Sequence, residues 1–438
     1  MHIHELSMSE REDIAVEAAA SHRTGKLGHG VVKRIASSLL LYPRYRLLWL
    51  SNLFFFAGVW TQTLVLGWLV FEYTHSEISV AIFTAARLSP MMLGPVSGVI
   101  SDRFDRPKLL LVASGWAFVM MVLIATLVAL NMASFWGLVF GGFCIGLAQS
   151  PSQPARFSLV ADFVGRESLS NANALNSIVV YLTQVIGPAL GGAMIASFGP
   201  AVALAVSAFW YLIAFVAIWP VRNLKNKHGS ASGESLGRSL AAGFQVVLSN
   251  RLLGAVLSVT FAANILLWPI YQGFMPVIAK EHLHLDPRGL GWLLACSGTG
   301  GLIGSLIIAS LGDFHYKGGL FVCATATWGA LWAVFALSSS IPLSFILMTL
   351  IGLASSPFAV LQTTLMLMMT KPQLQGRVMG IQELTIGIMP VASLMLGIAA
   401  EFIGIIHVAM LSGISLVIVL VILAVRIPAL LRYSGNDT

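Results

Sequence analysis

The residues of this 438-residue chain that could do ionic chemistry lie in short stretches between long apolar runs. The stretch GVISDRFDRPKLL, from Gly98 to Leu110, holds five charged residues of both signs. Side chains of opposite charge at this spacing can form ion pairs, and a carboxylate can cap a helix start, where the backbone dipole favours an anion. We therefore expect this stretch to hold one part of the molecule against another.

Arg87 is the second chemically distinctive residue, because it lies about 12 Å inside an apolar run at 1.5 Å per residue. A central arginine costs about 2.5–3.5 kcal/mol on membrane-insertion scales, and such residues usually face the interior of a helix bundle. Two interpretations stay open. Arg87 contacts an anionic substrate group or a coupling partner, or it makes a structural ion pair or a bond to backbone carbonyls near Pro90.

Other titratable groups inside the apolar runs are rare. Glu383 lies about one and a half turns into such a run, where a carboxylate is costly in lipid, so it is a candidate for proton coupling. The alternative is that it pairs with Arg377 or Arg103. No nucleophile–base pair or Walker-type phosphate loop occurs in the sequence. Glu281, His282 and His284 could bind a metal, but the alternative that they form an exposed charged loop is favoured. We therefore predict that the chain is not an enzyme, takes no metal or cofactor and does not use ATP directly.

The composition indicates the elements that must position these residues. Hydrophobic residues make up 57% of the chain and charged residues only 10%, whereas a soluble domain is about 25% charged. The chain is therefore expected to be an integral membrane protein in contact with the lipid bilayer. Its net charge of +7 is explained by membrane topology rather than by binding to nucleic acid.

Twelve runs have the length of about 20 apolar residues that a membrane-spanning helix needs. Uninterrupted apolar runs predict helices, because barrel strands would alternate polar and apolar residues. The predicted spans are approximately Leu47–Phe71, Ser79–Ile100, Leu109–Leu130, Phe135–Ala155, Ala174–Ser197, Ala201–Pro220, Leu252–Ala279, Leu290–Leu311, Leu320–Leu337, Leu343–Met369, Val378–Ala400 and Ile405–Ile427.

The basic residues are distributed unevenly between the two sides of these spans. The N-terminal segment, the connectors after spans 2, 4, 6, 8 and 10 and the C-terminal end hold 22 of the 25 Lys and Arg residues. Because basic loops stay in the cytoplasm, both termini are predicted to be cytoplasmic in a multi-pass protein of a bacterial-type inner membrane.

A polar connector after span 6 divides the chain into two sets of six spans. The predicted units are a cytoplasmic N-terminal segment (1–46), a six-helix bundle (47–221), a cytoplasmic linker (222–250), a second six-helix bundle (251–427) and a cytoplasmic tail (428–438). Asp102 after span 2 and Asp313 after span 8 take the same place in each set. This indicates two pseudo-symmetric halves with a substrate site between them.

The chain resembles the major facilitator superfamily over roughly Arg44 to Arg426. The superfamily signature between spans 2 and 3 is matched by Gly98, Asp102, Arg103, Arg106 and Lys108, with Asp105 where the family usually has glycine. The form DRFDR, with Arg87 and Pro90 upstream, is similar to the branch of enterobactin-type exporters. The stretch GPALGG in span 5 resembles the glycine-proline motif of drug–proton antiporters, although Thr183 and Ala174 stand where upstream glycines are expected.

The resemblance implies an all-α membrane protein whose twelve transmembrane helices form two six-helix bundles, and it implies roles for particular residues. In the family, spans 1, 4, 7 and 10 line the substrate cavity. The predicted cavity residues, each of which could instead bond two helices together, are Trp60, Gln62, Arg87, Gln149, Gln184, Asn264, Trp268, Gln272 and Gln362.

Two further sets of residues are implied. A conformational latch would join the halves where the first signature meets the start of span 11, with topology alone as the alternative. Its predicted residues are Gly98, Asp102, Arg103, Arg106, Asp313, Arg377 and Glu383. A helix-packing motif, Gly187, Pro188, Gly191 and Gly192, would slide against Gly300 and Gly304 of span 8, or would simply pack tightly.

We therefore predict a monomeric secondary transporter that works by alternating access. It would export a small amphipathic molecule, such as a drug, siderophore or metabolite, by proton antiport. The alternatives are an importer or facilitator of a small metabolite and a non-transporting membrane sensor.

Overall fold

A computed structural model describes residues 37–94, 104–224, 236–311, 314–371 and 374–434. For Ser37, 165–167, 170, 236–240 and 242 it describes the backbone alone. Within these ranges the regular structure is entirely helical, and ten helical stretches are long and apolar enough to cross a membrane. A helix satisfies all its backbone hydrogen bonds internally, which lipid requires.

The first half of the chain follows the predicted spans, with one difference between spans 4 and 5. Predicted span 2 corresponds to α5 and η1 and continues into residues outside the described part. The elements are α3 (Ser37–Leu41), α4 (Pro43–Thr74), α5 (Glu77–Leu88), the 3₁₀ helix η1 (Ser89–Leu93), α7 (Arg106–Ala129), α8 (Phe135–Phe198), α9 (Pro200–Ile218) and the 3₁₀ helix η2 (Trp219–Val221).

The second half of the chain also follows its six predicted spans, and the helices of spans 7 and 11 are interrupted near prolines. Pro269 and Pro276 flank a π-helical segment in span 7, and Pro390 stands at the junction of the two helices of span 11. The elements are α10 (Leu236–Ser249), α11 (Arg251–Leu266), η3 (Ile270–Phe274), α12 (Met275–Val277), η4 (Ile278–His282), α13 (Pro287–Leu311), α14 (Lys317–Leu337), α15 (Ile341–Met368), α16 (Gln375–Gly387), α17 (Met389–Ile403), α18 (Ile405–Arg426) and α19 (Pro428–Arg432).

Predicted spans 4 and 5 belong to one continuous helical stretch, α8, where the sequence predicted a connector over 156–173. The Asn52 side chain bonds both Arg156 and Asn176, which a straight helix would separate by about 30 Å. The chain therefore turns back on itself within α8. The connector stays helical because a helix satisfies its own backbone hydrogen bonds at the membrane boundary.

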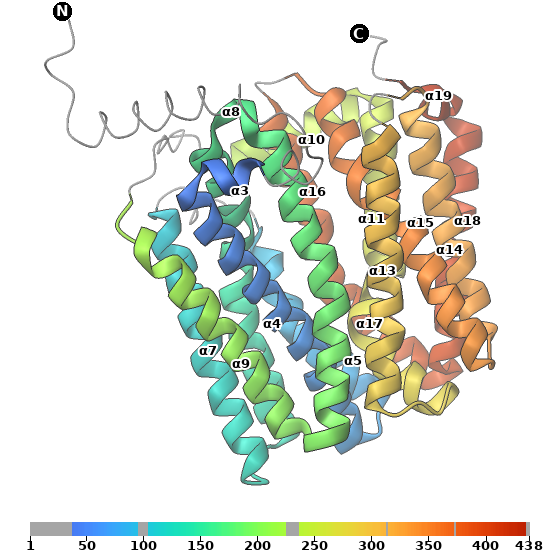
Figure 1. Cartoon of the computed structure of the whole chain (residues 1–438). Coiled ribbons are helices and arrows are strands. Elements are labelled where there is room, and N and C mark those ends of the chain that lie inside the picture. Colours follow the sequence, from blue (N-terminus) through green and yellow to red (C-terminus); the bar gives the residue numbers. More distant parts are fainter. Residues whose placement is uncertain (1–36, 95–103, 225–235, 312–313, 372–373, 435–438) are drawn as a thin grey trace, which may run out of the picture.

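The elements form one bundle of roughly parallel helices (Figure 1). Figure 1 places α3 and α19 at the same end, which we call the terminal face, and the opposite end the distal face. The helices coloured blue to green lie on one side and those coloured yellow to red on the other. The two halves pack together mainly through α8 against α13 and α5 against α17, and through η1 against α16.

Candidate functional site

Arg87 links the two halves of the molecule. It is the penultimate residue of α5 and is 3% exposed. Its Nη1 donates to Thr63 Oγ1 of α4 at 3.1 Å, and its Nη2 donates to Gln272 Oε1 of η3 at 3.1 Å. Neither partner is charged, and no carboxylate of the described residues pairs with this guanidinium. The structure therefore places a buried cation with neutral partners where the halves meet.

The partner Gln272 is presented by the π-helical segment η3. Pro269 has no backbone N–H to donate, and the chain after it adopts the wider π turn over Ile270–Phe274. Such turns are often found at functional sites. Gly273 in this turn faces α5 so closely that an added Cβ would lie 2.5 Å from Thr84 Oγ1. A glycine is thus needed for η3 to approach α5.

Aromatic side chains surround this contact. The Trp60 ring of α4 meets the Tyr271 ring of η3 edge to face, with centroids 6.1 Å apart. Tyr271 meets Trp268 in the same way at 5.8 Å, and Trp268 meets Trp328 of α14 at 6.0 Å. Trp60, Trp268 and Tyr271 are all half-buried. Four predicted cavity residues (Trp60, Arg87, Trp268 and Gln272) therefore come together around Tyr271.

The remaining predicted cavity residues lie elsewhere. Asn264 donates to Thr385 Oγ1 at 3.1 Å, and Gln362 accepts from Thr260 Oγ1 at 3.4 Å, so both join helices within the second half. Gln184 lies at the α8–α13 interface, where a Cβ on Gly298 would touch its backbone.

Gln62 and Gln149 are buried without a full set of hydrogen bonds. Neither the oxygen nor the nitrogen of the Gln62 amide has a partner, and the Gln149 Nε2 also has none, among the residues that the structure describes. Gln62 is 0% exposed and Gln149 is 3% exposed. A buried amide without partners is costly, so these groups mark a polar interior of the first half.

A second buried arginine, Arg156, lies in the connector that the sequence predicts after span 4, so the sequence does not single it out. It is 1% exposed, its Nη1 donates to Asn52 Oδ1 at 2.6 Å, and its guanidinium stacks 3.9 Å above the Phe55 ring. It is buried because α8 continues past the predicted end of the span. The sequence does not indicate this continuation, because Pro154 lies near the end of the apolar run and a proline there favours a helix end.

We expect Arg156→Ala to destabilise the protein by about 2 kcal/mol or more, because it removes the stacking and leaves the Asn52 oxygen unpaired in the core. The measurement is the temperature at which the detergent-solubilised protein loses its monodisperse peak in size-exclusion chromatography. Arg222→Ala is the matched control, because Arg222 also stacks on an aromatic ring, Trp219 at 4.3 Å, but is partly exposed. Equal effects of the two substitutions would contradict the stabilising role of the buried Arg156 contacts.

The predicted latch lies partly outside the described residues, which do not include Gly98, Asp102, Arg103 and Asp313. Arg106 pairs with Asp162 of α8 at 2.8 Å, a contact that joins α7 and α8 within the first half. Arg377 lies in the first turn of α16, where its backbone carbonyl faces Gly243 of α10. The role of these residues as a latch between the halves stays a prediction.

Glu383 lies where η1 meets α16. A Cβ added to Gly94 would lie 3.4 Å from the Glu383 Cβ, so the carboxylate stands beside the first half. Its side chain is exposed and forms no hydrogen bond or ion pair with any residue that the structure describes. Glu383 is thus a carboxylate with access to its surroundings at a contact between the halves.

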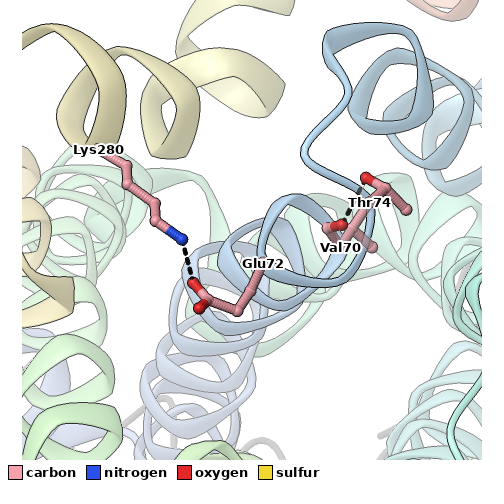
Figure 2. A network of polar contacts seen from close by, with 4 residues as sticks. All are labelled: Val70, Glu72, Thr74 and Lys280. Atoms are coloured by element: carbon pink, nitrogen blue, oxygen red, sulfur yellow. Dashed lines mark hydrogen bonds and ion pairs between the residues drawn. The ribbon is translucent and has the colours of Figure 1, made fainter.

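The distal face is held together by a small set of polar contacts between the halves, which we call the distal contacts. Glu72 at the end of α4 pairs with Lys280 of η4, as Figure 2 shows. Glu77 Oε1 of α5 accepts a hydrogen bond from the Ile405 N–H at the start of α18 at 3.1 Å. Arg288 Nη2 of α13 donates to Ser197 Oγ of α8 at 3.1 Å. Each contact joins the first half to the second.

Glu77 precedes the predicted span 2, and its surroundings disfavour the charged form. Burial raises the pKa of its carboxyl from the ordinary value of 4.5 to about 6. The hydrogen bond from Ile405 lowers the pKa, and the neighbouring carboxylates Glu281 and Glu401 raise it. The closed distal face therefore binds this proton more tightly than a state in which Glu77 is free in water. The stabilisation of the closed distal face by protonated Glu77 is complete below about pH 4.5 and is lost as the pH rises through about 6.

We expect the distal face to open more readily at pH 7.5 than at pH 5. Ser393→Cys, in a background without the native cysteines, places a thiol at a buried position of α17 against Ala81 of α5. Maleimide labelling of this thiol, normalised to an exposed Ser339→Cys variant, should be about threefold to tenfold faster at the higher pH. Adding Glu77→Gln, which cannot ionise, should make labelling slow and independent of pH. A normalised rate with the same pH dependence in both backgrounds would contradict this role of Glu77.

The glycine motif of α8 packs against two different helices. A Cβ on Gly187 would lie 2.7 Å from Trp60 Cβ, and one on Gly191 would lie 3.3 Å from Thr61 Cγ2, so both face α4. Gly192 instead faces α13, where an added Cβ would overlap the Pro287 carbonyl oxygen. The motif cannot present one face, because successive residues of a helix are rotated by about 100°.

The predicted partners of this motif in span 8 also lie elsewhere. Gly291 of α13 faces α8, where its Cβ would lie 2.5 Å from the Pro188 carbonyl oxygen. Gly300 and Gly304 face α15 instead, close to the Thr349 and Leu353 carbonyls. The glycine of the motif that meets the second half is therefore Gly192, which packs against Gly291 near the distal face.

Comparisons with known proteins agree with this architecture. The family model described as transmembrane secretion effector matches residues 37–433, so the chain belongs to this family of the major facilitator superfamily. The protein is a transporter by family, with no enzyme among its homologues. The prediction of an all-α membrane protein with the major facilitator fold is confirmed.

Three relatives show the range of the family. The chain is 26% identical to the enterobactin exporter EntS of Shigella flexneri over 79% of this chain and 82% of the relative. It is 22% identical to the staphyloferrin A transporter of Staphylococcus aureus, over 83% and 91% of the two chains. It is 25% identical to the multidrug efflux pump Tap of Mycobacterium tuberculosis, over 85% and 91%.

Solved structures share the fold. A POT family transporter in complex with a thioalcohol-conjugated peptide superposes with a TM-score of 0.72 at 11% identity, covering 88% of this chain and 96% of that one. A bacterial homologue of the lysosomal transporter Spinster, inward-facing and unoccupied, gives a TM-score of 0.62 at 15% identity, covering 90% and 96%. These likenesses concern the fold alone.

Proposed function

We propose that the protein is a secondary active exporter of a small amphipathic molecule, such as a siderophore or a drug. It works by alternating access between two six-helix bundles, 47–221 and 251–427, with both termini in the cytoplasm of a bacterial cell. The names of the relatives, which export enterobactin or drugs, support the direction and the kind of substrate. The concentration of basic residues at the predicted cytoplasmic connectors supports the orientation.

The observation that carries this proposal is the nature of the distal contacts. Glu72–Lys280, Glu77–Ile405 and Ser197–Arg288 each join the halves by a single polar bond, and each bond includes at least one side chain that is partly or fully exposed. Partly exposed ion pairs and hydrogen bonds are weak, so they can break without a large loss of buried apolar area. Alternating access requires such an interface, which opens and closes around a central site.

The proposed driving force is proton antiport, with Glu383 as the proton carrier. A carboxylate in a spanning helix is a functional candidate by default, and Glu383 stands between the halves without a bonded partner among the described residues. The sequence offers no phosphate-binding loop that would couple transport to ATP.

Uptake into inside-out membrane vesicles tests the proposal. A fluorescent amphipathic dye should accumulate only in vesicles that contain the protein and carry an imposed pH gradient. Dye binding that saturates without accumulation would identify a sensor instead. Accumulation in right-side-out vesicles, with none in inside-out vesicles, would identify an importer. Either result would overturn the proposal.

A further inference from the structure

We propose that Arg87, Trp60 and Tyr271 form a binding site for a substrate that joins an anionic group, such as a carboxylate, to an aromatic ring. This inference rests on the proposed export function and names the chemical class of molecule that the central site accepts.

The charge of the site supports an anion. Arg87 is buried and keeps its positive charge, and its two hydrogen bonds go to the neutral side chains of Thr63 and Gln272. A guanidinium has five N–H donors in a planar fork that fits a carboxylate, and these two bonds use only two of them. A buried cation without an ionic partner is costly, and an arriving anion removes that cost. A cationic substrate would be repelled at the same place.

Arg156 shows why the burial of an arginine alone is not enough. Its guanidinium is covered by the Phe55 ring and bonded to Asn52 inside the first half. Among the described residues its hydrogen bonds and ring contacts all lie within the first half, so a ligand bound there would not respond to the separation of the bundles. Arg87 differs because its partners Thr63 and Gln272 belong to opposite halves. A ligand at Arg87 can replace this bond and so couple its own binding to the alternation of the halves.

The rings beside Arg87 support an aromatic group. Gln272, the acceptor of the Arg87 bond, follows Tyr271 directly in η3, and the Tyr271 ring lies between those of Trp60 and Trp268. Both contacts are edge to face, so each pair covers at most one of its four ring faces. The three side chains are only half-buried. Partly exposed rings of this kind favour stacking or edge contacts with an aromatic ligand.

Binding of three matched probes to the full chain in nanodiscs tests the inference. 2-Naphthoate, 2-naphthamide and 2-naphthylmethylammonium share one ring system and differ in charge, and tryptophan fluorescence reports their binding. We expect 2-naphthoate to bind about tenfold tighter than the amide, as a charge-assisted bond would give, and the ammonium to bind weakest. Equal affinities for the three probes in the unmodified protein would overturn the proposal whatever any variant does.

Variants then assign the selectivity to its residues. Arg87→Gln should bring the ratio of naphthoate to naphthamide affinity close to one, and Arg87→Lys, which keeps a charge, should retain part of it. Trp60→Leu should weaken naphthoate binding about fivefold while leaving decanoate binding unchanged. Arg222→Gln, which removes an arginine far from the site, should change neither ratio. Charge selectivity that survives in Arg87→Gln would overturn the assignment.

The two proposals fail in different ways. If the vesicles accumulate dye under a pH gradient while the probes show no preference for the anion, the substrate class is wrong and the export function stands. If neither accumulation nor probe binding is observed, the export function itself is wrong.

Discussion

Glu383→Gln is expected to lower export driven by a pH gradient by about 20-fold or more, since a carrier without its proton site retains only uncoupled movement. Glutamine has the same shape as glutamate but cannot bind and release a proton. Exchange of labelled for unlabelled substrate, which needs no net proton transfer, should continue at close to the normal rate. The measurement compares dye accumulation under an imposed gradient with exchange in its absence, both in inside-out vesicles.

Glu401→Gln is the matched control for this prediction. Glu401 belongs to α17, the continuation of the same predicted span, but lies exposed near the distal face. Burial and Glu281 still raise the pKa of Glu77 when Glu401 is replaced. The substitution should therefore leave export driven by the gradient within about twofold of normal. If Glu383→Gln kept its response to the gradient, or lost exchange and accumulation together, Glu383 would not be the proton carrier.

Gly192→Ala is expected to slow export by about tenfold or more and to leave the distal face open. The added methyl group would overlap the Pro287 carbonyl oxygen and approach the Gly291 Cα to 3.0 Å, so α8 and α13 must separate near the distal face. Overpacking of this kind costs about 1–3 kcal/mol, which shifts an equilibrium between closed and open states by a factor of five to more than a hundred.

Labelling of Ser393→Cys, which lies where α17 packs against α5, measures the opening of the distal face independently of transport. It should become faster in Gly192→Ala, because the halves are expected to separate as rigid bodies. Gly254→Ala is the control, since its added methyl group would meet only the Val247 carbonyl at an ordinary 3.5 Å. Unchanged labelling and export in Gly192→Ala would show that the interface tolerates a side chain there and that close glycine packing is not required.

The glycine motif shows how far spacing alone could lead. Four glycine and proline positions in GPALGG predicted a smooth face toward span 8, and in the structure each of these glycines lies close to a neighbouring helix. It assigns two glycines to α4 and one to α13, because the helix rotates between Gly191 and Gly192. Spacing predicts that a neighbour comes close, but only the packed bundle shows which neighbour it is.

The two buried arginines show a similar division. Arg87 stood out because it interrupts an apolar run, and the structure places it at the contact between the halves. Arg156 was hidden, because it follows Pro154 at the edge of an apolar run and the helix continues beyond that edge. Asn264 and Gln362 looked like cavity residues from their place in the spans, yet their bonds go to neighbouring helices of the same half.

The sequence by itself determined that this is a membrane protein built of long apolar helices, because lipid leaves the backbone no other way to satisfy its hydrogen bonds. It also determined the superfamily, since the charged signature between spans 2 and 3 carries the resemblance. Only the tertiary structure decided which polar side chains face one another. Periodicity places a residue on one side of its own helix, while partners such as Arg87 and Gln272, 185 residues apart, meet through the packing of separate helices.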